Sequence, residues 1–210
     1  MKKNIDCFCG ACFQFEYDEE INIDDNPEYL EEILNGTFMS SVCASCGKNH
    51  KPEFNIKIIW NAKNLTLNVI PELERGSYYR QTKDPDKKKG KTSSETIIGY
   101  PYMADRIAVY KDNLEPAVIE ALKSFLLAKA EENYPDKDIN AWYRSSSPLE
   151  IEFHLDGIKH GETAVLKIPK ETYDKTLKDY KKHPGKEIYS SLRVRSYLSV
   201  QNILQPRYFS

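Results

Sequence analysis

The chain has 210 residues, of which 30% are charged and 40% hydrophobic, a globular composition that excludes disorder over the whole length. A formal net charge of -2 gives no bulk attraction to nucleic acid or to an anionic membrane. No apolar run approaches the ~20 residues of a membrane helix, and no apolar stretch follows the two N-terminal lysines as in a secretion signal. We therefore expect a cytoplasmic protein with reduced thiols and no membrane partner.

The first elements in chain order are a strand and a short helix. The run "FQFEYDEEINI" alternates apolar and polar residues, and this period of two predicts a strand. The following "NPEYLEEILNG" predicts a helix, because Asn26 is a suitable N-cap and Pro27 fits the first helical position. Gly36 can end this helix in the left-handed conformation.

Two further strands are expected at residues 54–60 and 65–70, which the turn-like "NAKN" separates. From residue 74 to residue 99 the pattern disappears, and we expect a long exposed loop. Within it, basic and aromatic residues interleave over residues 75–91 and could bind single-stranded nucleic acid, against the simpler interpretation of a solvated loop. The residues concerned are Arg75, Tyr78, Tyr79, Arg80, Lys87, Lys88, Lys89 and Lys91.

The rest of the chain predicts mixed elements. "RIAVY", residues 106–110, indicates a short strand, and a strong helix is expected over residues 114–132. Residues 148–157 and 162–169 predict a hairpin, and residues 170–185 a helix. The remaining tail is ambiguous, with helix slightly favoured over strand. The apolar face of the strong helix would comprise Leu114, Val118, Ala121, Leu122, Phe125 and Leu126.

Two C-x-x-C pairs, Cys9 with Cys12 and Cys43 with Cys46, each place two thiols on one turn. Tetrahedral zinc takes four soft ligands, and two such turns supply them. We therefore predict one structural zinc ion per chain on these four cysteines. Four thiolates leave no open position for water, so no Lewis-acid catalysis follows. The interval between the pairs exceeds that of an ordinary zinc ribbon because the predicted helix is inserted between them.

The fifth cysteine leaves the first ligand pair open. Gly10 directly follows Cys9, a glycine also follows the second pair, and a glycine after the second ligand relaxes such a turn. Glycine placement therefore favours Cys7 with Cys9, whereas spacing favours Cys9 with Cys12. We give spacing more weight and keep Cys7 as the alternative ligand. His50 could also substitute as a ligand, but an exposed histidine in a turn is the simpler interpretation.

Redox chemistry is a second hypothesis for Cys9 and Cys12, as a dithiol oxidoreductase or a thiol sensor. In dithiol motifs of the thioredoxin kind, the start of a helix lowers the pKa of the first thiol. Here a strand is expected to follow instead. The sequence contains no phosphate-binding glycine loop, nucleophile elbow or H-E-x-x-H helix, so the interpretation leans away from an enzyme.

The order of these features resembles the bacterial CpXC domain, a family of uncharacterised function named for paired Cys-Pro-x-Cys motifs. The resemblance runs through an I-N motif, a Pro-x-Leu motif and a glycine to the second cysteine pair, and the later strong helix is similar to the family's downstream helix. Both pairs lack the family's proline, since Gly10 or Phe8, and Ala44, stand in its place. The residues that carry the resemblance are Ile21, Asn22, Pro27, Leu30, Gly36, Cys43 and Cys46.

We thus expect an α+β protein with an N-terminal zinc-ribbon-like pair of cysteine turns and an inserted short helix, followed by mixed strands and helices. The CpXC-like domain is expected over residues 1–130, with cysteine turns at 7–12 and 43–46 and the exposed loop at 74–99. Residues 131–210 would form a C-terminal α+β region, separate or part of the same fold. The resemblance implies no reaction, and the expected role is a non-enzymatic zinc-binding module or adaptor with a protein partner.

Overall fold

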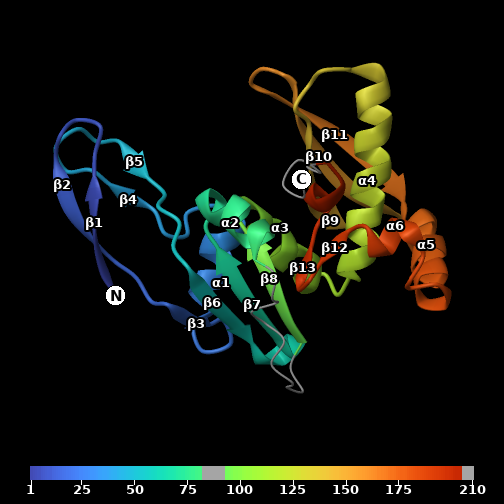
Figure 1. The fold of residues 1–210 in the computed structure, drawn as a ribbon, viewed down its shortest axis with the longest axis horizontal. Coiled ribbons are helices and arrows are strands. Elements are labelled where there is room, and N and C mark those ends of the chain that lie inside the picture. The colour runs from blue at the N-terminus through green and yellow to red at the C-terminus, as the bar shows by residue number, and fades with distance from the viewer. Residues whose placement is uncertain (82–92, 205–210) are drawn as a thin grey trace. The chain divides into compact units, whose positions relative to one another are not determined.

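A computed structural model describes residues 1–81 and 93–204 (Figure 1). The chain forms two compact units, Met1–Ala104 and Asp105–Ser210. Helices and strands are mixed along the chain, which confirms the expected α+β class. The expected boundary at residue 130 followed the extent of the resemblance, whereas the division between the units falls earlier, within helix α3 (Tyr100–Lys111).

Two short antiparallel hairpins carry the cysteines of the first unit (Figure 1). The first pairs β1 (Lys2–Asp6) with β2 (Cys12–Glu16), and the second pairs β4 (Ser41–Val42) with β5 (Asn49–His50). The turn of each hairpin contains two cysteines. The expected strand after the first cysteines is therefore shorter than its sequence run, and the alternating pattern resumes only in a separate strand.

That separate strand, β3 (Glu20–Asn22), belongs to a sheet in which the strands of the first unit follow the order β8-β7-β6-β3. β6 (Ile56–Trp60) and β7 (Leu65–Ile70) form the expected antiparallel hairpin, and every second residue of both is buried. β3 runs parallel to β6, and β8 (Ser93–Ile98) runs parallel to β7. Parallel strands are joined by long connections, so nearby sequence could not predict that β3 pairs with β6 or that β8 pairs with β7.

The short helix α1 (Pro27–Asn35) has the expected bounds. Gly36 ends it with a φ of 69°, and the Gly36 N–H donates to helical carbonyls, as a left-handed C-cap does. Asn26 precedes the helix without capping it through its side chain, because its amide points back to the Asn22 carbonyl at 3.4 Å. Ile33 is fully buried and anchors the helix in the first unit.

The expectation of an exposed loop over residues 74–99 is wrong at both ends. Helix α2 (Arg75–Arg80) follows the 3-10 turn η2 (Glu72–Glu74) and buries Tyr78 and Tyr79. At the other end, β8 is a strand that pairs in parallel with β7. A helix of six residues is too short to display a helical period, and the parallel partner of β8 is distant along the chain. Sequence periodicity therefore missed both elements.

The burial of residues in α2 also weakens the nucleic-acid hypothesis. Arg75 is only 3% exposed, donates to the Glu72 carboxylate at 2.8 Å and also donates to the Ile98 carbonyl. The two tyrosines between the arginines are buried, so their rings present no stacking surface. The lysines of the hypothesis lie outside the described residues: Lys87, Lys88, Lys89 and Lys91.

The second unit is built on α4 (Pro116–Asn133), the strong helix expected from sequence. It packs on an antiparallel sheet of order β11-β10-β9, formed by β9 (Asn140–Ser146), β10 (Glu150–Lys159) and β11 (Glu162–Pro169). α5 (Lys170–Lys182) also packs on α4. The expected hairpin and C-terminal helix are thereby confirmed. Among the described residues, no helix is both long enough and apolar enough to cross a bilayer.

Two other expectations about the second half need correction. Residues 106–110 continue helix α3 instead of forming a strand, because a five-residue apolar run fits either structure. The ambiguous tail contains both kinds of element: α6 (Glu187–Ser190), β12 (Arg193–Val194), β13 (Tyr197–Leu198) and α7 (Gln201–Leu204).

The N-terminal half of α4 is buried on all sides, including the charged residues Glu120 and Lys123. Phe125, expected on the buried face, is instead 57% exposed. Hydrophobic periodicity predicts that one face of a helix is buried. The first turns of α4 are instead buried on every face, so periodicity alone could not predict which residues are exposed. Buried charge requires partners, and a polar network supplies them.

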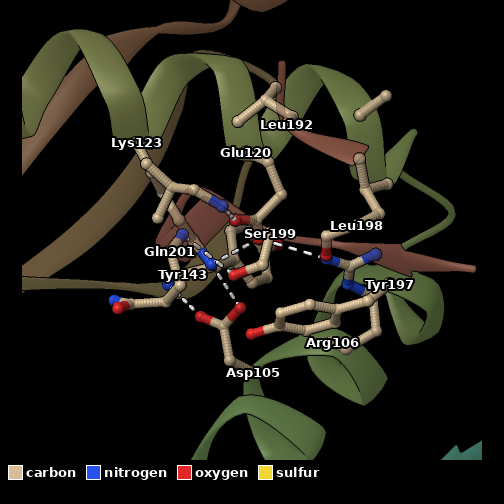
Figure 2. Close-up of polar contacts among 12 residues, drawn as sticks. Asp105, Arg106, Glu120, Lys123, Tyr143, Leu192, Tyr197, Leu198, Ser199 and Gln201 are labelled. Atoms are coloured by element: carbon tan, nitrogen blue, oxygen red, sulfur yellow. Dashed lines mark hydrogen bonds and ion pairs between the residues drawn. The ribbon is translucent and has the colours of Figure 1, made fainter. Parts of the chain in front are cut away.

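Figure 2 shows this network, which joins α3 to α4 through two acids and two bases. Lys123 Nζ donates to Glu120 Oε1 at 2.9 Å and also to the Asp105 carboxylate. Arg106 Nη2 donates to Glu120 Oε1 at 3.2 Å and to the Leu198 carbonyl at 2.8 Å. All four charged side chains are at most 5% exposed, so the ion pairs are shielded from solvent.

Backbone groups complete the network. The Tyr143 N–H donates to Asp105 Oδ1 at 2.6 Å (Figure 2). The Val200 N–H donates to Glu120 Oε2 at 2.7 Å. Burial raises the pKa of Asp105 despite the nearby Lys123 ammonium. Burial acts in the same direction on Glu120, but two cations hold the pKa of Glu120 below its usual value. The network therefore fixes β13 and β9 around α4 with balanced charge.

Candidate metal centre

The first cysteine turn connects β1 to β2. The Cys7 N–H donates to the Ala11 carbonyl at 2.8 Å, and the Gly10 N–H donates to the Cys7 carbonyl at 2.9 Å. Gly10 has a φ of 87°, a conformation that glycine adopts without steric cost. The turn thus ends before Cys12, which is already the first residue of β2. Cys7 and Cys9 are its two sulfur-bearing residues.

The second cysteine turn connects β4 to β5 in a similar way. The Cys43 N–H donates to the Lys48 carbonyl at 2.9 Å, and the Gly47 N–H donates to the Cys43 carbonyl at 2.8 Å. Gly47 has a φ of 71° and follows Cys46 directly, as Gly10 follows its own cysteine. Both turns therefore place a left-handed glycine after their second cysteine.

The two turns bring four sulfurs together, those of Cys7, Cys9, Cys43 and Cys46, all within 4.8 Å of one another. The Cys7 and Cys46 sulfurs are 3.5 Å apart, and the Cys9 and Cys43 sulfurs are 3.8 Å apart. Four sulfurs each ~2.3 Å from one tetrahedral zinc ion lie ~3.8 Å from one another. The cluster, which we call the four-thiol cluster, therefore fits zinc in both donor type and spacing.

Cys12 is not part of the four-thiol cluster. It pairs across the hairpin with Asp6, and a hydrogen bond to the Asp6 carboxylate raises the pKa of the Cys12 thiol. The sulfurs that the structure groups are thus those of the alternative set, with Cys7 in place of Cys12. The raised pKa of the Cys12 thiol is opposite to what a reactive thiolate requires. Which cysteines bind metal stays a prediction.

His50 lies in β5, half-buried, and not in the exposed turn that the sequence suggested. Its Nε2 is 3.2 Å from the Cys7 sulfur, and its ring meets Phe13 edge to face with centroids 5.5 Å apart. His50 therefore lies beside the Cys7 sulfur, where a ring N–H can donate a hydrogen bond to the thiolate. The sequence suggested His50 as a possible substitute ligand but gave no sign of a contact with Cys7.

The pKa values of two thiols in the cluster, those of Cys43 and Cys7, are shifted in opposite directions. The backbone N–H groups of Ser45 and Cys46 lower the pKa of Cys43 to about 7, although burial acts in the opposite direction. The Cys9 N–H lowers the pKa of Cys7, but burial and the neighbouring thiols outweigh it and raise that pKa to about 12. Crowded thiolates repel one another, and a divalent cation among them removes that repulsion. The four-thiol cluster could therefore hold a metal ion.

These features define a mixed α+β protein with a cysteine cluster on paired turns in its N-terminal region. A family model described as CpXC protein matches residues 5–123, more than half of the chain, and the chain therefore belongs to the CpXC family. An uncharacterised protein of Treponema pallidum (strain Nichols) is 29% identical over 212 residues, which cover 94% of this chain and 96% of the relative. No solved structure matches the chain.

Proposed function

We propose that the first unit binds one structural zinc ion through Cys7, Cys9, Cys43 and Cys46 and acts as a non-enzymatic module that contacts another protein. The observation that carries the zinc proposal is the convergence of the four sulfurs within 4.8 Å. Four thiolates fill a tetrahedral shell and leave no position for water, which favours a structural role over a catalytic one. Reduced thiols are also consistent with the cytoplasmic location that we propose.

The surface of the cysteine hairpins supports a protein partner. Phe8, between the two cysteines of the first turn, is 93% exposed, and Val42 beside the second turn is 63% exposed. Exposed apolar side chains that gather on one surface mark candidate contact sites, and aromatic residues are frequent anchors of interfaces. Because zinc would hold the turn that bears Phe8, this side chain would be presented in a fixed position.

Metal analysis tests the zinc proposal directly. Protein purified under reducing conditions and without chelators is expected to contain one zinc ion per chain, because the two turns supply four ligands for a single ion. The measurement is elemental analysis against protein concentration. A zinc content well below half an equivalent would contradict the proposal.

Substitution of Phe8 tests the partner role. Phe8→Ser is expected to abolish recovery of a partner protein in affinity purification while leaving zinc content and thermal unfolding unchanged, because the side chain is exposed and makes no core contact. Leu73→Ser is the matched control, since Leu73 is 98% exposed but lies in η2, outside the cysteine hairpins. Equal loss of the partner in both variants, or in neither, would argue against the hairpin surface as the contact site.

A further inference from the structure

The first unit contains a cavity of about 440 Å³, a volume in the range of small-molecule sites. Three parts of the chain line it: the open end of the β1–β2 hairpin with residues 17–18, helix α1, and residues 37–40 between α1 and β4. The lining combines aromatic rings with carboxylates. Both kinds of group attract organic cations.

Two aromatic rings form adjoining walls of the cavity. Tyr29 and Phe38 meet edge to face, with centroids 6.0 Å apart and an angle of 88° between their planes. Tyr17, which also lines the cavity, is stacked on Phe54 with centroids 4.0 Å apart. Rings at right angles can contact one cation from two sides, as in the aromatic cages that bind ammonium groups. The ring contacts therefore preorganise the cavity for such a cation.

The cations in the lining are already engaged. Lys2 Nζ pairs with Glu16 at 2.5 Å, and the hydrogen bond from Lys2 lowers the pKa of Glu16. The Met1 ammonium donates to the Tyr17 carbonyl. The lining contains three carboxylates, so the carboxylates outnumber these two cations.

The other two carboxylates, those of Asp18 and Glu32, lie near Tyr29. The Tyr29 hydroxyl donates to Asp18 Oδ2 at 3.4 Å. Burial raises the pKa of Tyr29, and the negative charges of Asp18 and Glu32 act in the same direction. Within residues 1–81 and 93–204, neither carboxylate forms an ion pair. Unpaired negative charge thus lies beside the aromatic wall.

Ser40 adds a hydrogen-bonding group to the lining. Its hydroxyl oxygen is buried and has no hydrogen-bond partner in the part of the chain that the structure describes. A buried hydroxyl group without a partner is costly, and a ligand with an N–H group can supply that partner. Because Ser40 lines the cavity, an amine is favoured over a quaternary ammonium ion, which has no N–H to donate.

A hard metal ion fits this cavity less well than an organic cation does. Calcium takes ~6–8 oxygen ligands that converge on one point. Among the described residues, three or more candidate ligand atoms of His, Cys, Asp or Glu come within 4.8 Å of one another only in the four-thiol cluster. The carboxylates of the cavity therefore do not converge as a metal site requires, and aromatic rings offer calcium no ligand atoms.

We propose that this cavity binds a small organic amine as its ammonium ion. The rings of Tyr29 and Phe38 contact the cation and its alkyl chain, and Asp18 and Glu32 supply the opposite charge. The site is independent of the zinc ion and of the hairpin contact proposed above, since neither a cysteine nor Phe8 lines the cavity.

Calorimetric titration of the full chain tests the proposal, with putrescine, butylamine and butanol as probes. On the same alkyl chain, putrescine carries an ammonium group at both ends, butylamine at one end and butanol at neither. Putrescine is expected to bind more tightly than butylamine, because two carboxylates are unpaired, and butanol is expected not to bind. Calcium chloride is expected not to compete with putrescine, and competition at equal concentration would contradict an organic-cation site.

Substitutions of the lining separate charge from ring. Asp18→Asn and Glu32→Gln are each expected to weaken putrescine binding about tenfold, because each removes one charge-assisted interaction and preserves the side-chain shape. Tyr29→Phe keeps the ring and is expected to retain binding, whereas Tyr29→Leu is expected to weaken it. Glu31→Gln is the charge-matched control, since Glu31 is exposed in α1 beside Glu32 but lies outside the cavity. Thermal unfolding checks that each variant is folded.

The outcomes are distinct. No binding of either amine at millimolar concentration would overturn the proposal. So would equal binding of butanol, which would indicate an apolar pocket without charge recognition, or equal weakening by Glu31→Gln, which would indicate general attraction by surface charge. Tighter binding of a peptide with a single lysine than of butylamine would replace the small amine with a segment of another protein.

Discussion

Cys7→Ser is expected to abolish zinc binding and to destabilise the first unit, whereas Cys12→Ser is expected to do neither. The Cys7 sulfur belongs to the four-thiol cluster, while Cys12 faces Asp6 across the hairpin. Structural zinc contributes ~10–16 kcal/mol in small peptides at neutral pH, and a typical domain is stable by only ~5–15 kcal/mol. Loss of one ligand therefore removes free energy comparable with the whole stability of the unit.

The two cysteine variants form a matched pair, because both lie in the first hairpin and both change one sulfur to oxygen. Zinc content and thermal unfolding are measured side by side with the parent. Retention of zinc by Cys7→Ser together with its loss from Cys12→Ser would move the site to the set favoured by spacing: Cys9, Cys12, Cys43 and Cys46. Retention by both variants would contradict a required role of either Cys7 or Cys12 in zinc binding.

Lys123→Met is expected to destabilise the second unit by ~3–5 kcal/mol, the usual cost of removing one partner from a buried ion pair. The substitution leaves the buried carboxylates of Asp105 and Glu120 with Arg106 as the only cation of the network (Figure 2). The control is Lys175→Met, which breaks an exposed pair with Glu171 and is expected to change stability by ~0.5 kcal/mol or less.

Denaturant unfolding measures both changes. The chain has two tryptophans, one in each unit, so a Trp60→Phe background leaves Trp142 as the reporter of the second unit. A cost below ~1 kcal/mol for Lys123→Met would contradict the structural role of the network, because surface substitutions usually cost ~0.5 kcal/mol or less.

The same variant has an expected pH dependence. Without the Lys123 ammonium, burial and mutual repulsion should raise the folded-state pKa of Asp105 further above its unfolded value. A carboxyl group with a raised folded-state pKa stabilises the fold below its unfolded pKa, and that contribution disappears as the pH rises through the folded value. The stability difference between Lys123→Met and the parent should therefore narrow as the pH falls, and a constant difference would contradict this explanation.

Several features of this protein are determined by residues close together in sequence. α1 begins at Pro27 and ends at Gly36 because backbone preferences act over single residues. α4 and the β6–β7 hairpin follow from hydrophobic period and a short turn. The family and the cluster of cysteines in the N-terminal region can likewise be recognised from the sequence. These signals are local, so they remain correct without knowledge of the fold.

Tertiary structure decided what depends on distant partners. β8 is a strand because it pairs in parallel with β7, and the buried charges of α4 are satisfied from α3 and the C-terminal segments. The grouping of Cys7 instead of Cys12 follows from the hairpin register that pairs Asp6 with Cys12. The glycine after Cys9 favoured the pair Cys7 and Cys9, whereas the C-x-x-C spacing favoured Cys9 and Cys12. Sequence spacing counts residues along the chain, whereas a metal site requires sulfurs that meet in space, and strand pairing sets where they meet.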